Sequence, residues 1–588
     1  MRFEPIIPAA IEWQGDTPYS AAYGDIYFSR EGGLAETAYV FLEGNGLPGR
    51  WRDKPHFTIC ETGFGTGLNF LCTAKAWEEN RRPDGWLYYI SIEKHPIAKT
   101  DLARIHAQLP QALHPLAQEM CAGLPPAIPG FYWQIFPERR IALLLIQADI
   151  EVALEEMEAK IDAWFLDGFA PGRNPAMWGD ALYSAMRRLS APAATCATYS
   201  AASAVREGLS SARFEWQKRK GFGHKKHMLC GKLPDIAAPQ RVATDNRAIV
   251  IGGGLAGCFA AAALARHGRE VTLIERHEAL AQEASGNPAA ILKPYLAKQW
   301  SGQTLLYMQA FHHARETAER LGAFHSTGAL QLETQKNNVD WQQQIISQLG
   351  LPEELTSMVT AQQASEIAGI GLKCGAIHLP TGGWIHPQSF CHAALRQAGV
   401  EPLLQTEALT LERSGNLWRV NNQLEAPVVI VANAKDALAF SPLAHLKLHH
   451  VRGQITGFRK SMPLKTILSY DGYALPQSDN ITLGATFHPR DTERLSREED
   501  NNKNICAFNQ ISAEPWPLTK ISERVAWRTT TPSKLPIAGE MAEGLYVSLG
   551  LGSRGAMLAP YLAEQLAAEI TGTPQPLQKS VKKLLSNY

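Results

Sequence analysis

The 588-residue chain is long enough for two large domains, at roughly 100–200 residues per domain. Its 57 Lys and Arg residues balance its 57 Asp and Glu residues, so the whole molecule is no polycation and any nucleic acid must contact a local basic patch. The nine cysteines form no C-x-x-C pair, and no histidine cluster has metal-ligand spacing. We therefore expect reduced, buried thiols and no metal site.

Targeting signals are missing from the sequence. The N-terminus, MRFEPIIPAAIEW, lacks a basic region followed by a long apolar stretch, and no window approaches 18 apolar residues without charge. An odd number of unpaired cysteines is typical of a reducing compartment. We expect a cytoplasmic protein without a membrane segment.

A glycine-rich loop follows the apolar run HFTIC, residues 56–60. The loop, ETGFGTG, leads into the helix-forming run LNFLCTAKAWEE, so we expect a strand, a turn and a helix. Glycines let the backbone approach a ligand closely, although a tight turn without a ligand has the same sequence. The loop glycines are Gly63, Gly65 and Gly67.

Acidic residues surround this loop. Glu93 ends the next apolar run, WLYYISIE, where a carboxylate can accept hydrogen bonds from both ribose hydroxyls of a nucleoside. The loop lacks the Lys-Ser/Thr of a P-loop, and Glu61 adds negative charge. The pattern favours a cationic nucleoside without phosphates, such as S-adenosylmethionine (SAM). Asp149, which ends a later strand, either binds the adenine amino group or caps the following helix.

The segment AWFLDGFAPGRNPAMW carries Asp167 at the end of a very apolar strand. A carboxylate at that position, beside aromatic residues, suits a substrate amine or base, although it can also cap the turn that follows. Phe169 and Trp178 could sandwich a flat base.

A basic segment, residues 216–228, lies near the end of this half of the chain. Such runs are usually solvated surface, but next to a base-binding site phosphate contacts from RNA are the better interpretation. Its cationic residues are Lys218, Arg219, Lys220, Lys225 and Lys226.

A second strand–loop–helix unit, RAIVI-GGGLAG-CFAAAALARHG, begins at residue 247. We expect domains at 1–235 and 247–588, joined by a linker at 236–246 that contains proline and small residues. Gly252, Gly254 and Gly257 form G-x-G-x-x-G after a strand, and Glu275 closes the next strand. This is the complete dinucleotide fingerprint, with the pyrophosphate on the helix N-terminus and Glu275 on the ribose.

Later segments favour FAD over NAD. The turn ASGNPAAILKPYL, which contains Ser285, can wrap phosphates and flavin, and the chain returns near its end with a strand, a glycine turn and a helix. That turn contains Gly550, Gly552 and Gly555. Alternating strands and helices predict parallel sheets in both halves, and the runs NLWRVNNQ, PVVIVANA and KLHHVRGQITGF indicate a mostly antiparallel substrate domain inside the second half.

Several of these motifs resemble a known family. DIYFS, ETAYVFLEGNGLPGRW, ETGFGTGLNFL, FLDGFAPGRNPAMW, TYSAASAVREGL and GFGHKKHML are similar to the methyltransferase half of bifunctional tRNA 5-methylaminomethyl-2-thiouridine biosynthesis proteins. VRGQI, DGYALP, TPSKLPIAG and LGLGSRGAML are similar to their oxidase half and to D-amino-acid oxidase-type flavoproteins. The resemblance implies an α/β protein, with a Rossmann-like class I methyltransferase followed by an FAD-binding Rossmann-type domain with an antiparallel substrate subdomain.

The resemblance also implies chemistry. The FAD domain would remove the carboxymethyl group of 5-carboxymethylaminomethyl-2-thiouridine as glyoxylate, and the SAM domain would methylate the amine that remains, with Asp167 matching the family's active-site aspartate. Arg528 aligns with the carboxylate-binding arginine of amine oxidases, and Arg554 is a second candidate, although either could be a structural ion pair. Tyr473 is a weaker candidate for lining the pocket. Ser533 and Thr529 depart from the family's usual Asp and Pro.

Two other functions fit part of the sequence. A small-molecule amino-acid oxidase fused to an N-methyltransferase would need neither the basic patch nor the stacking aromatics. An RNA-binding scaffold with a vestigial flavin site would be expected to lose Glu275 or the loop glycines, which are all present. The favoured hypothesis is an enzyme acting on the wobble uridine of tRNA, with FAD bound non-covalently.

Overall fold

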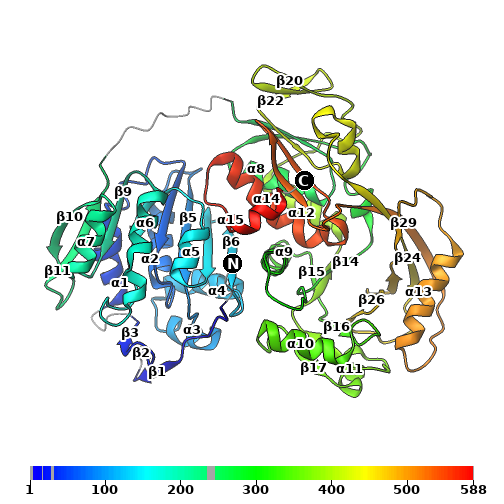
Figure 1. The fold of residues 1–588 in the computed structure, drawn as a ribbon, viewed down its shortest axis with the longest axis horizontal. Helices are drawn as coiled ribbons and strands as arrows, with labels where there is room; N and C mark the ends of the chain where they lie inside the picture. Colours follow the sequence, from blue (N-terminus) through cyan, green and yellow to red (C-terminus); the bar gives the residue numbers. More distant parts are fainter. Residues whose placement is uncertain (1–3, 16, 28–31, 235–244, 587–588) are drawn as a thin grey trace. The chain divides into compact units, whose positions relative to one another are not determined.

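The computed structural model describes residues 4–15, 17–27, 32–234 and 245–586. The chain separates into two compact units (Figure 1). One contains residues 2–242 and 571–579, and the other contains residues 243–570 and 580–588. The C-terminal segment 571–579 therefore groups with the N-terminal unit, which differs from the expected domain limit. The predicted linker, 236–246, lies outside the described residues except for its last two.

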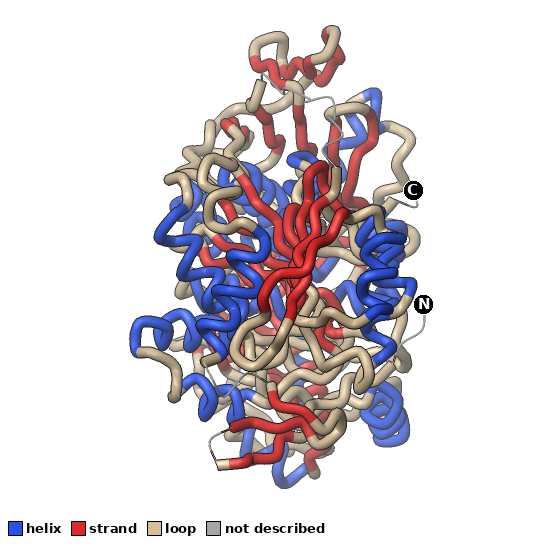
Figure 2. The backbone as a smooth tube through the Cα atoms, turned by 90° about the vertical axis from the view of Figure 1, so that its left-hand side faces the viewer, coloured by secondary structure: helices blue, strands red, loops and turns tan. Residues whose placement is uncertain are grey.

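The N-terminal unit is built around one twisted sheet with helices on both sides (Figure 2). Its strand order is β10-β11-β9-β8-β4-β5-β7-β6, and the central strands β9, β8, β4, β5 and β7 run parallel. The strands are β4 (His56–Glu61), β5 (Trp86–Glu93), β6 (Gly130–Phe136), β7 (Ile141–Gln147), β8 (Ile161–Phe165), β9 (Ser190–Thr198), β10 (Glu215–Lys220) and β11 (His227–Lys232).

Burial explains why these runs become strands. Nearly every residue of β4 to β7 is buried, as expected for strands covered on both faces. The helices of this unit are α1 (Gly33–Glu36), α2 (Leu68–Asn80), α3 (Lys99–His106), α4 (His114–Gly123), α5 (Ile150–Glu156), α6 (Asp180–Leu189) and α7 (Ser203–Ser211). A π-helical turn, η1 (Thr37–Leu42), continues α1, and a small sheet contains β1 (Ile11–Gln14), β2 (Thr17–Ser20) and β3 (Asp25–Ile26).

The C-terminal unit contains a second nucleotide-binding type of sheet, with the order β13-β12-β23-β31-β30. All neighbours in it are parallel except the last pair. The run PVVIVANA, which we grouped with the antiparallel substrate domain, is β23 at the centre of this sheet. The elements are β12 (Arg247–Ile251), α8 (Leu255–Arg266), β13 (Glu270–Ile274), β23 (Val428–Val431), β30 (Ile537–Ala542), β31 (Leu545–Leu549) and α14 (Gly555–Thr571).

The same unit contains a larger, nine-stranded sheet, here called the substrate sheet. All its strand pairs are antiparallel except β16 with β25, which confirms the expected subdomain. Its strands are β16 (Ala329–Leu332), β17 (Ser357–Val359), β18 (Ala376–Leu379), β24 (His449–Arg459), β25 (Ile467–Ser469), β26 (Tyr473–Pro476), β27 (Asn480–Gly484), β28 (His488–Pro489) and β29 (Lys520–Thr530).

The remaining elements cover these two sheets. Small sheets contain β14 (Ala290–Leu292), β15 (Phe324–Ser326) and β19 (Gly383–Ile385), and β20 (Leu411–Ser414), β21 (Leu417–Val420) and β22 (Leu424–Ala426). The helices are α9 (Gly302–Arg320), α10 (Val339–Leu349), α11 (Ala361–Ala368), α12 (Pro387–Ala398), α13 (Glu498–Ile511) and α15 (Lys579–Leu585). Among the described residues, none of the helices has the length and apolar character needed to cross a bilayer.

Candidate active sites

The first site lies where the order of the N-terminal sheet reverses. From β4 the chain goes to β5 on one side and later to β8 on the other, and ligands of parallel sheets bind at the carboxyl ends of such a strand pair. Glu61 ends β4 and Asp167 follows β8. The Thr62 hydroxyl donates to the Asp167 carbonyl at 2.7 Å, which holds the two segments together.

The first glycine loop donates a hydrogen bond to the Glu93 carboxylate, which ends the next strand. The Gly65 N–H donates to Glu93 Oε2 at 2.9 Å, and the His95 N–H donates to Oε1 at 2.8 Å. Gly65 and Gly67 have φ of 50° and 75°, a conformation that favours glycine. Gly63 has no such φ, and a Cβ there would meet the Gly168 backbone at 3.4 Å. Glycine is therefore favoured by backbone conformation at positions 65 and 67, whereas a Cβ at position 63 would make an ordinary contact.

Glu61 is a fully buried carboxyl group in this site. Ser91 Oγ donates to its Oε2 at 2.6 Å, while Oε1 is buried without a hydrogen-bond partner among the described residues. Burial raises the pKa of Glu61 to about 8, against the opposing effect of the Ser91 hydrogen bond. An orphaned carboxyl oxygen beside a loop without lysine or arginine fits a cationic ligand such as SAM.

Asp167 is held by two donors. The Gly168 N–H donates to Oδ1 at 2.8 Å, and Asn69 Nδ2 donates to Oδ2 at 2.7 Å. The Thr37 hydroxyl donates to Asn69 Oδ1 at 2.7 Å, so the amide can present only its NH2 group to Asp167. Burial raises the pKa of Asp167 to about 6, and the two hydrogen bonds oppose that rise. The carboxylate is thus oriented and easily protonated near neutral pH.

The two aromatic residues after Asp167 differ in their surroundings. Phe169 is partly exposed and stacks on Tyr23, with ring centroids 4.5 Å apart. Trp178 is only 6% exposed, and its indole N–H donates to the Phe169 carbonyl at 3.1 Å. Trp178 therefore supports the loop and does not offer a face for stacking, whereas Tyr23, which we did not predict, lies beside Phe169.

Asp149 has the structural role that we considered as its alternative. It is the N-cap of α5, where its Oδ1 accepts the Glu151 N–H at 3.0 Å. Its Oδ2 pairs with Lys94 Nζ at 2.9 Å. Both oxygens already have partners within the protein.

The basic segment forms the β10–β11 hairpin at the edge of the N-terminal sheet. Side chains alternate along a strand, so Lys218 and Lys220 lie on one face and Arg219 lies on the other. The segment is therefore not one continuous patch. In the turn, Lys225 lies 3.9 Å from the Tyr199 ring centroid and pairs with Glu36 at 2.8 Å. Lys226 is exposed in the same turn.

Tyr199 connects this turn to the first site, because its hydroxyl donates to the Gly168 carbonyl. Lys225 also acts electrostatically on Asp167, where it lowers the pKa against the larger effect of burial. A cation from the hairpin therefore lies within electrostatic range of the candidate catalytic carboxylate.

The second glycine loop, between β12 and α8, is shaped by close backbone contacts. A Cβ at Gly257 would lie 1.8 Å from the Gly252 carbonyl oxygen, and only glycine avoids this clash. Gly252 has a φ of 108°, and a Cβ there would meet the Ala432 backbone at 3.0 Å. A Cβ at Gly254 would meet only Ser285 Oγ, at 3.3 Å. This cradle fits a pyrophosphate at the start of a helix.

Glu275 and Ser285 complete the loop. The buried Glu275 carboxylate accepts the Gly253 N–H at 2.7 Å and the His277 N–H at 2.9 Å. The Leu255 N–H, at the start of α8, donates to Ser285 Oγ at 3.2 Å. The Ser285 turn therefore lies against the helix N-terminus, as expected for a segment that contacts a cofactor's phosphates.

The glycine turn after β31 is also present. Gly550 and Gly552 have φ of 71° and 59°, and Gly555 begins α14. Arg554 lies between Gly552 and Gly555. Its guanidinium is 5.0 Å from the Tyr295 ring centroid and 4.9 Å from the Tyr307 ring centroid.

Arg528 lies on β29 with room made by a glycine. A Cβ at Gly453 on the neighbouring strand would come within 2.6 Å of Arg528 Nη2. Burial lowers the pKa of Arg528, and nearby Tyr473 opposes that effect. Among the described residues, no carboxylate pairs with Arg528 or Arg554. Two arginines without counter-charges suit an anionic ligand.

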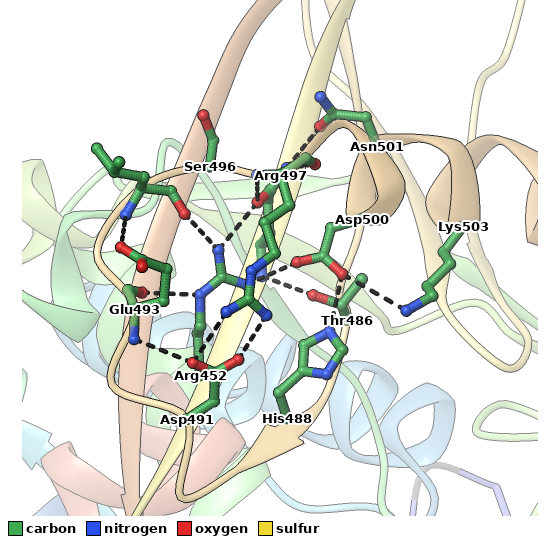
Figure 3. Close-up of polar contacts among 12 residues, drawn as sticks. Arg452, Thr486, His488, Asp491, Glu493, Ser496, Arg497, Asp500, Asn501 and Lys503 are labelled. Carbon is green, nitrogen blue, oxygen red and sulfur yellow. Dashed lines mark hydrogen bonds and ion pairs between the residues drawn. The ribbon is translucent and has the colours of Figure 1, made fainter.

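The opposite face of the same strands carries a buried ion-pair network under α13 (Figure 3). Arg452 is 0% exposed and pairs with Asp500 at 2.6 Å, and His488 contacts the other Asp500 oxygen at 2.8 Å. Burial would raise the pKa of Asp500, but the hydrogen bonds from His488 and Arg452 lower it. Residues 451 and 453 face Arg528, while Arg452 between them anchors the strand from behind.

Sequence reasoning missed the residues that position the predicted ones. Asn69, Tyr23, Tyr199 and Gly453 acquire their roles from partners 31 to 146 positions away, so spacing along the chain carries little signal. Asn69, Tyr199 and Gly453 lie inside segments that the sequence singled out, but nothing there indicated these roles, and Tyr23 lies outside all of them.

Comparisons with known proteins identify both halves of the chain. A family described as FAD dependent oxidoreductase matches residues 247–569, and one described as S-adenosyl-L-methionine-dependent methyltransferase matches residues 111–234. The chain uses FAD and SAM accordingly. L-proline dehydrogenase from P. horikoshii has the same fold as the oxidoreductase half, with a TM-score of 0.50, 20% identity, and coverage of 58% of this chain and 96% of that one.

Similar sequences span both halves. A protein of Methylobacillus flagellatus named tRNA 5-methylaminomethyl-2-thiouridine biosynthesis bifunctional protein MnmC is 37% identical, covering 100% of this chain and 96% of its own. One of the same name from Stutzerimonas stutzeri is 37% identical, covering 97% and 96%. The chain therefore belongs to the MnmC family of bifunctional enzymes, in which an SAM-dependent methyltransferase is joined to an FAD-dependent oxidoreductase.

Proposed function

We propose that the two domains act in turn on the wobble uridine of tRNA. The oxidoreductase domain removes the carboxymethyl group of 5-carboxymethylaminomethyl-2-thiouridine, and the methyltransferase domain converts the 5-aminomethyl product to 5-methylaminomethyl-2-thiouridine. The observation that carries this proposal is the full-length similarity to relatives named for that biosynthesis, which spans both cofactor loops. Because its substrate would be tRNA, we also propose that the enzyme acts in the cytoplasm.

In the oxidoreductase domain, the loop with Gly252, Gly254 and Gly257, together with Glu275 and Ser285, would hold FAD. When bound, FAD accepts two electrons and one hydrogen from the N–CH2 carbon of the substrate. Arg528 is the better candidate for the substrate carboxylate, because no carboxylate of the described residues pairs with it and its guanidinium lies against Gly453, which has no side chain to cover it. Tyr473 lines the same region, and Arg554 provides a second cation near the glycine turn. The imine then hydrolyses and glyoxylate leaves.

In the methyltransferase domain, Glu61, Glu93 and the loop glycines would bind SAM. The substrate amine must lose a proton before it attacks the methyl group. Asp167, oriented by hydrogen bonds from Asn69 and Gly168, would hold the ammonium, orient the lone pair and accept the proton. Since the sulfonium already activates the methyl group, positioning supplies much of the rate. Phe169 with Tyr23 offers an aromatic surface for the uridine, and the β10–β11 hairpin offers cations for the RNA backbone.

Mass spectrometry of tRNA nucleosides tests both steps. Purified protein is incubated with tRNA carrying 5-carboxymethylaminomethyl-2-thiouridine, first without SAM and then with it. We expect loss of the carboxymethyl group alone, followed by gain of one methyl group when SAM is added. If a folded, FAD-containing protein changes neither, while it oxidises free sarcosine or glycine efficiently, the small-molecule oxidase replaces the tRNA hypothesis.

A further inference from the structure

The strand register shows which residues of the substrate sheet share one face. Partners in register project to the same face. The pairs Gln331–Ser469, Ser469–Tyr473 and Tyr473–Gly484 carry this face from β16 to β27. It continues over β24 to β29, where Arg528 influences Tyr473 electrostatically. This face therefore carries Gln331, Tyr473 and Arg528 together.

Lys293 reaches this face from the segment that follows β14. Its Nζ donates to Gln331 Oε1 at 2.7 Å. Gln331 Nε2 donates to the Ser469 carbonyl at 3.3 Å, which fixes the amide with its oxygen toward the lysine. Lys293 is therefore held in one place, on the same face of the sheet as Tyr473 and Arg528.

The surroundings of Lys293 favour its neutral form. Burial is the larger cause and the charge of Arg554 is the second, and together they lower the pKa of Lys293 to about 8. Among the described residues, no carboxylate pairs with Lys293. The other titratable groups of this region are Tyr295 and Tyr307, which surround Arg554, and Tyr473 with Arg528 on the sheet. None of these groups is a carboxylate.

We propose that Lys293 is a catalytic base of the oxidoreductase domain, taking the proton from the secondary ammonium of the substrate while Arg528 holds the carboxylate. This inference rests on the proposed function. The N–H proton passes to Lys293 Nζ, and the freed lone pair forms the C=N bond as the C–H bond of the N–CH2 carbon breaks. That hydrogen leaves with two electrons to oxidised FAD. Water adds to the imine carbon, the C–N bond breaks to give glyoxylate and the primary amine, and Lys293 returns its proton to solvent.

The test compares K293M, K293R and the wild-type holoenzyme in full-length form, on tRNA carrying the carboxymethylaminomethyl group. The rate measured is kcat/KM for glyoxylate formation between pH 6 and 10. We expect K293M to lose about 100-fold or more at neutral pH. Its rate should recover toward high pH, where solvent deprotonates the substrate amine. K293R should stay impaired, because its guanidinium remains protonated. K298M is the matched control, since Lys298 is exposed nearby.

A second measurement separates proton transfer from carboxylate binding. A thioether analogue, with sulfur in place of the amine nitrogen, keeps the carboxylate but has no proton to give. Its affinity, followed by the change in flavin absorbance, should be the same for K293M and wild type. Analogue binding weakened at least tenfold in K293M and restored in K293R would instead assign Lys293 to the carboxylate and overturn the inference.

Two further outcomes are distinguishable. A K293M enzyme with wild-type kcat/KM and pH profile would also overturn the inference, whereas an inactive wild-type enzyme would count against the proposed function itself. FAD content and thermal unfolding are measured for each variant. If K293M does not retain FAD, K293Q provides the same test, because its amide can donate to Gln331 but cannot accept a proton.

Discussion

The two units hold an acidic side chain against a glycine loop in the same manner. Glu93 accepts N–H groups from Gly65 and from His95, two residues further along. Glu275 accepts N–H groups from Gly253 and from His277, again two residues further along. Each carboxylate ends or follows the second parallel strand and leaves its outer lone pairs for a ribose. We propose that this one local arrangement binds SAM in the first unit and FAD in the second.

Glycine is needed in the two loops for different physical reasons, a backbone contact in one and a positive φ in the other. Gly257 is needed because α8 packs against the Gly252 carbonyl, with only 1.8 Å available for a Cβ. Gly67 is needed because its φ is 75°, while its nearest neighbours are flexible side chains such as Met120. A clash between backbone atoms cannot relax, whereas a strained φ costs a limited amount. Substitutions should therefore affect the two loops unequally.

The largest expected effect is that of G257A. Its Cβ would separate α8 from β12, so we expect purified protein without bound FAD and without glyoxylate formation, while SAM-dependent methylation of 5-aminomethyl-2-thiouridine continues. Flavin absorbance and the two half-reactions measure this. G399A is the control, because it lies outside the loop and its Cβ would meet nothing within 4 Å, so only its φ of 67° is strained. Equal FAD loss in both variants would contradict the backbone-contact argument.

The next effect is that of D167N, which removes the proton acceptor but preserves the size of the side chain. We expect methylation to fall by about 10²–10⁴-fold, with oxidation unchanged. In the wild type, methylation should decline as pH falls through about 6, because the raised pKa lets Asp167 protonate there, well above its ordinary value of 3.8. Oxidation measured on the same samples shows whether the decline is specific to this domain.

D167N should also change stability. Burial makes the ionised carboxylate unfavourable in the folded protein, so stability is lost as pH rises from the unfolded pKa through the folded one. A neutral amide removes this pH-dependent loss, although its NH2 group would face either Asn69 or the Gly168 N–H. We therefore expect the unfolding midpoint of this unit to fall less in D167N than in wild type as pH rises from 4 to 7. An equal fall in both proteins would contradict the raised pKa of Asp167.

How far the sequence predicted these sites depends on the range of the interactions. Both glycine loops, their acidic partners and the strand carrying Asp167 are local patterns, and the structure contains each of them. Trp178 was wrong as a stacking surface, since its burial depends on the fold of its loop. The basic segment is continuous in sequence, but in the β10–β11 hairpin Arg219 lies on the opposite face from Lys218 and Lys220. Lys293 lies in the turn ASGNPAAILKPYL, but its proposed role gave no signal, because Gln331 and Arg554 are far from it along the chain.

E93Q and E275Q compare the two acidic residues directly. A glutamine offers one acceptor oxygen and one NH2 group, so one of the two backbone N–H groups would face a donor. Leaving such a group unpaired costs about 1–3 kcal/mol, or roughly five- to 150-fold in affinity if the loss falls on the cofactor-binding state. We expect weaker SAM binding in E93Q alone and weaker FAD binding in E275Q alone, measured by calorimetry and by flavin fluorescence. Loss of both cofactors in either variant would contradict independent sites.

The smallest expected effect is that of G67A. A non-glycine residue in the left-handed region costs about 1–2 kcal/mol, and Met120 and Phe64 can shift by the few tenths of an ångström that a methyl group needs. We expect the free energy of unfolding to fall by that amount, with methylation retained at saturating SAM and FAD content unchanged. G49A, whose Cβ meets only an ordinary contact at 3.5 Å, should be nearly neutral. If G67A abolished SAM binding as completely as G257A abolishes FAD binding, the two loops would be equally rigid, and the difference between backbone contact and backbone strain would not hold.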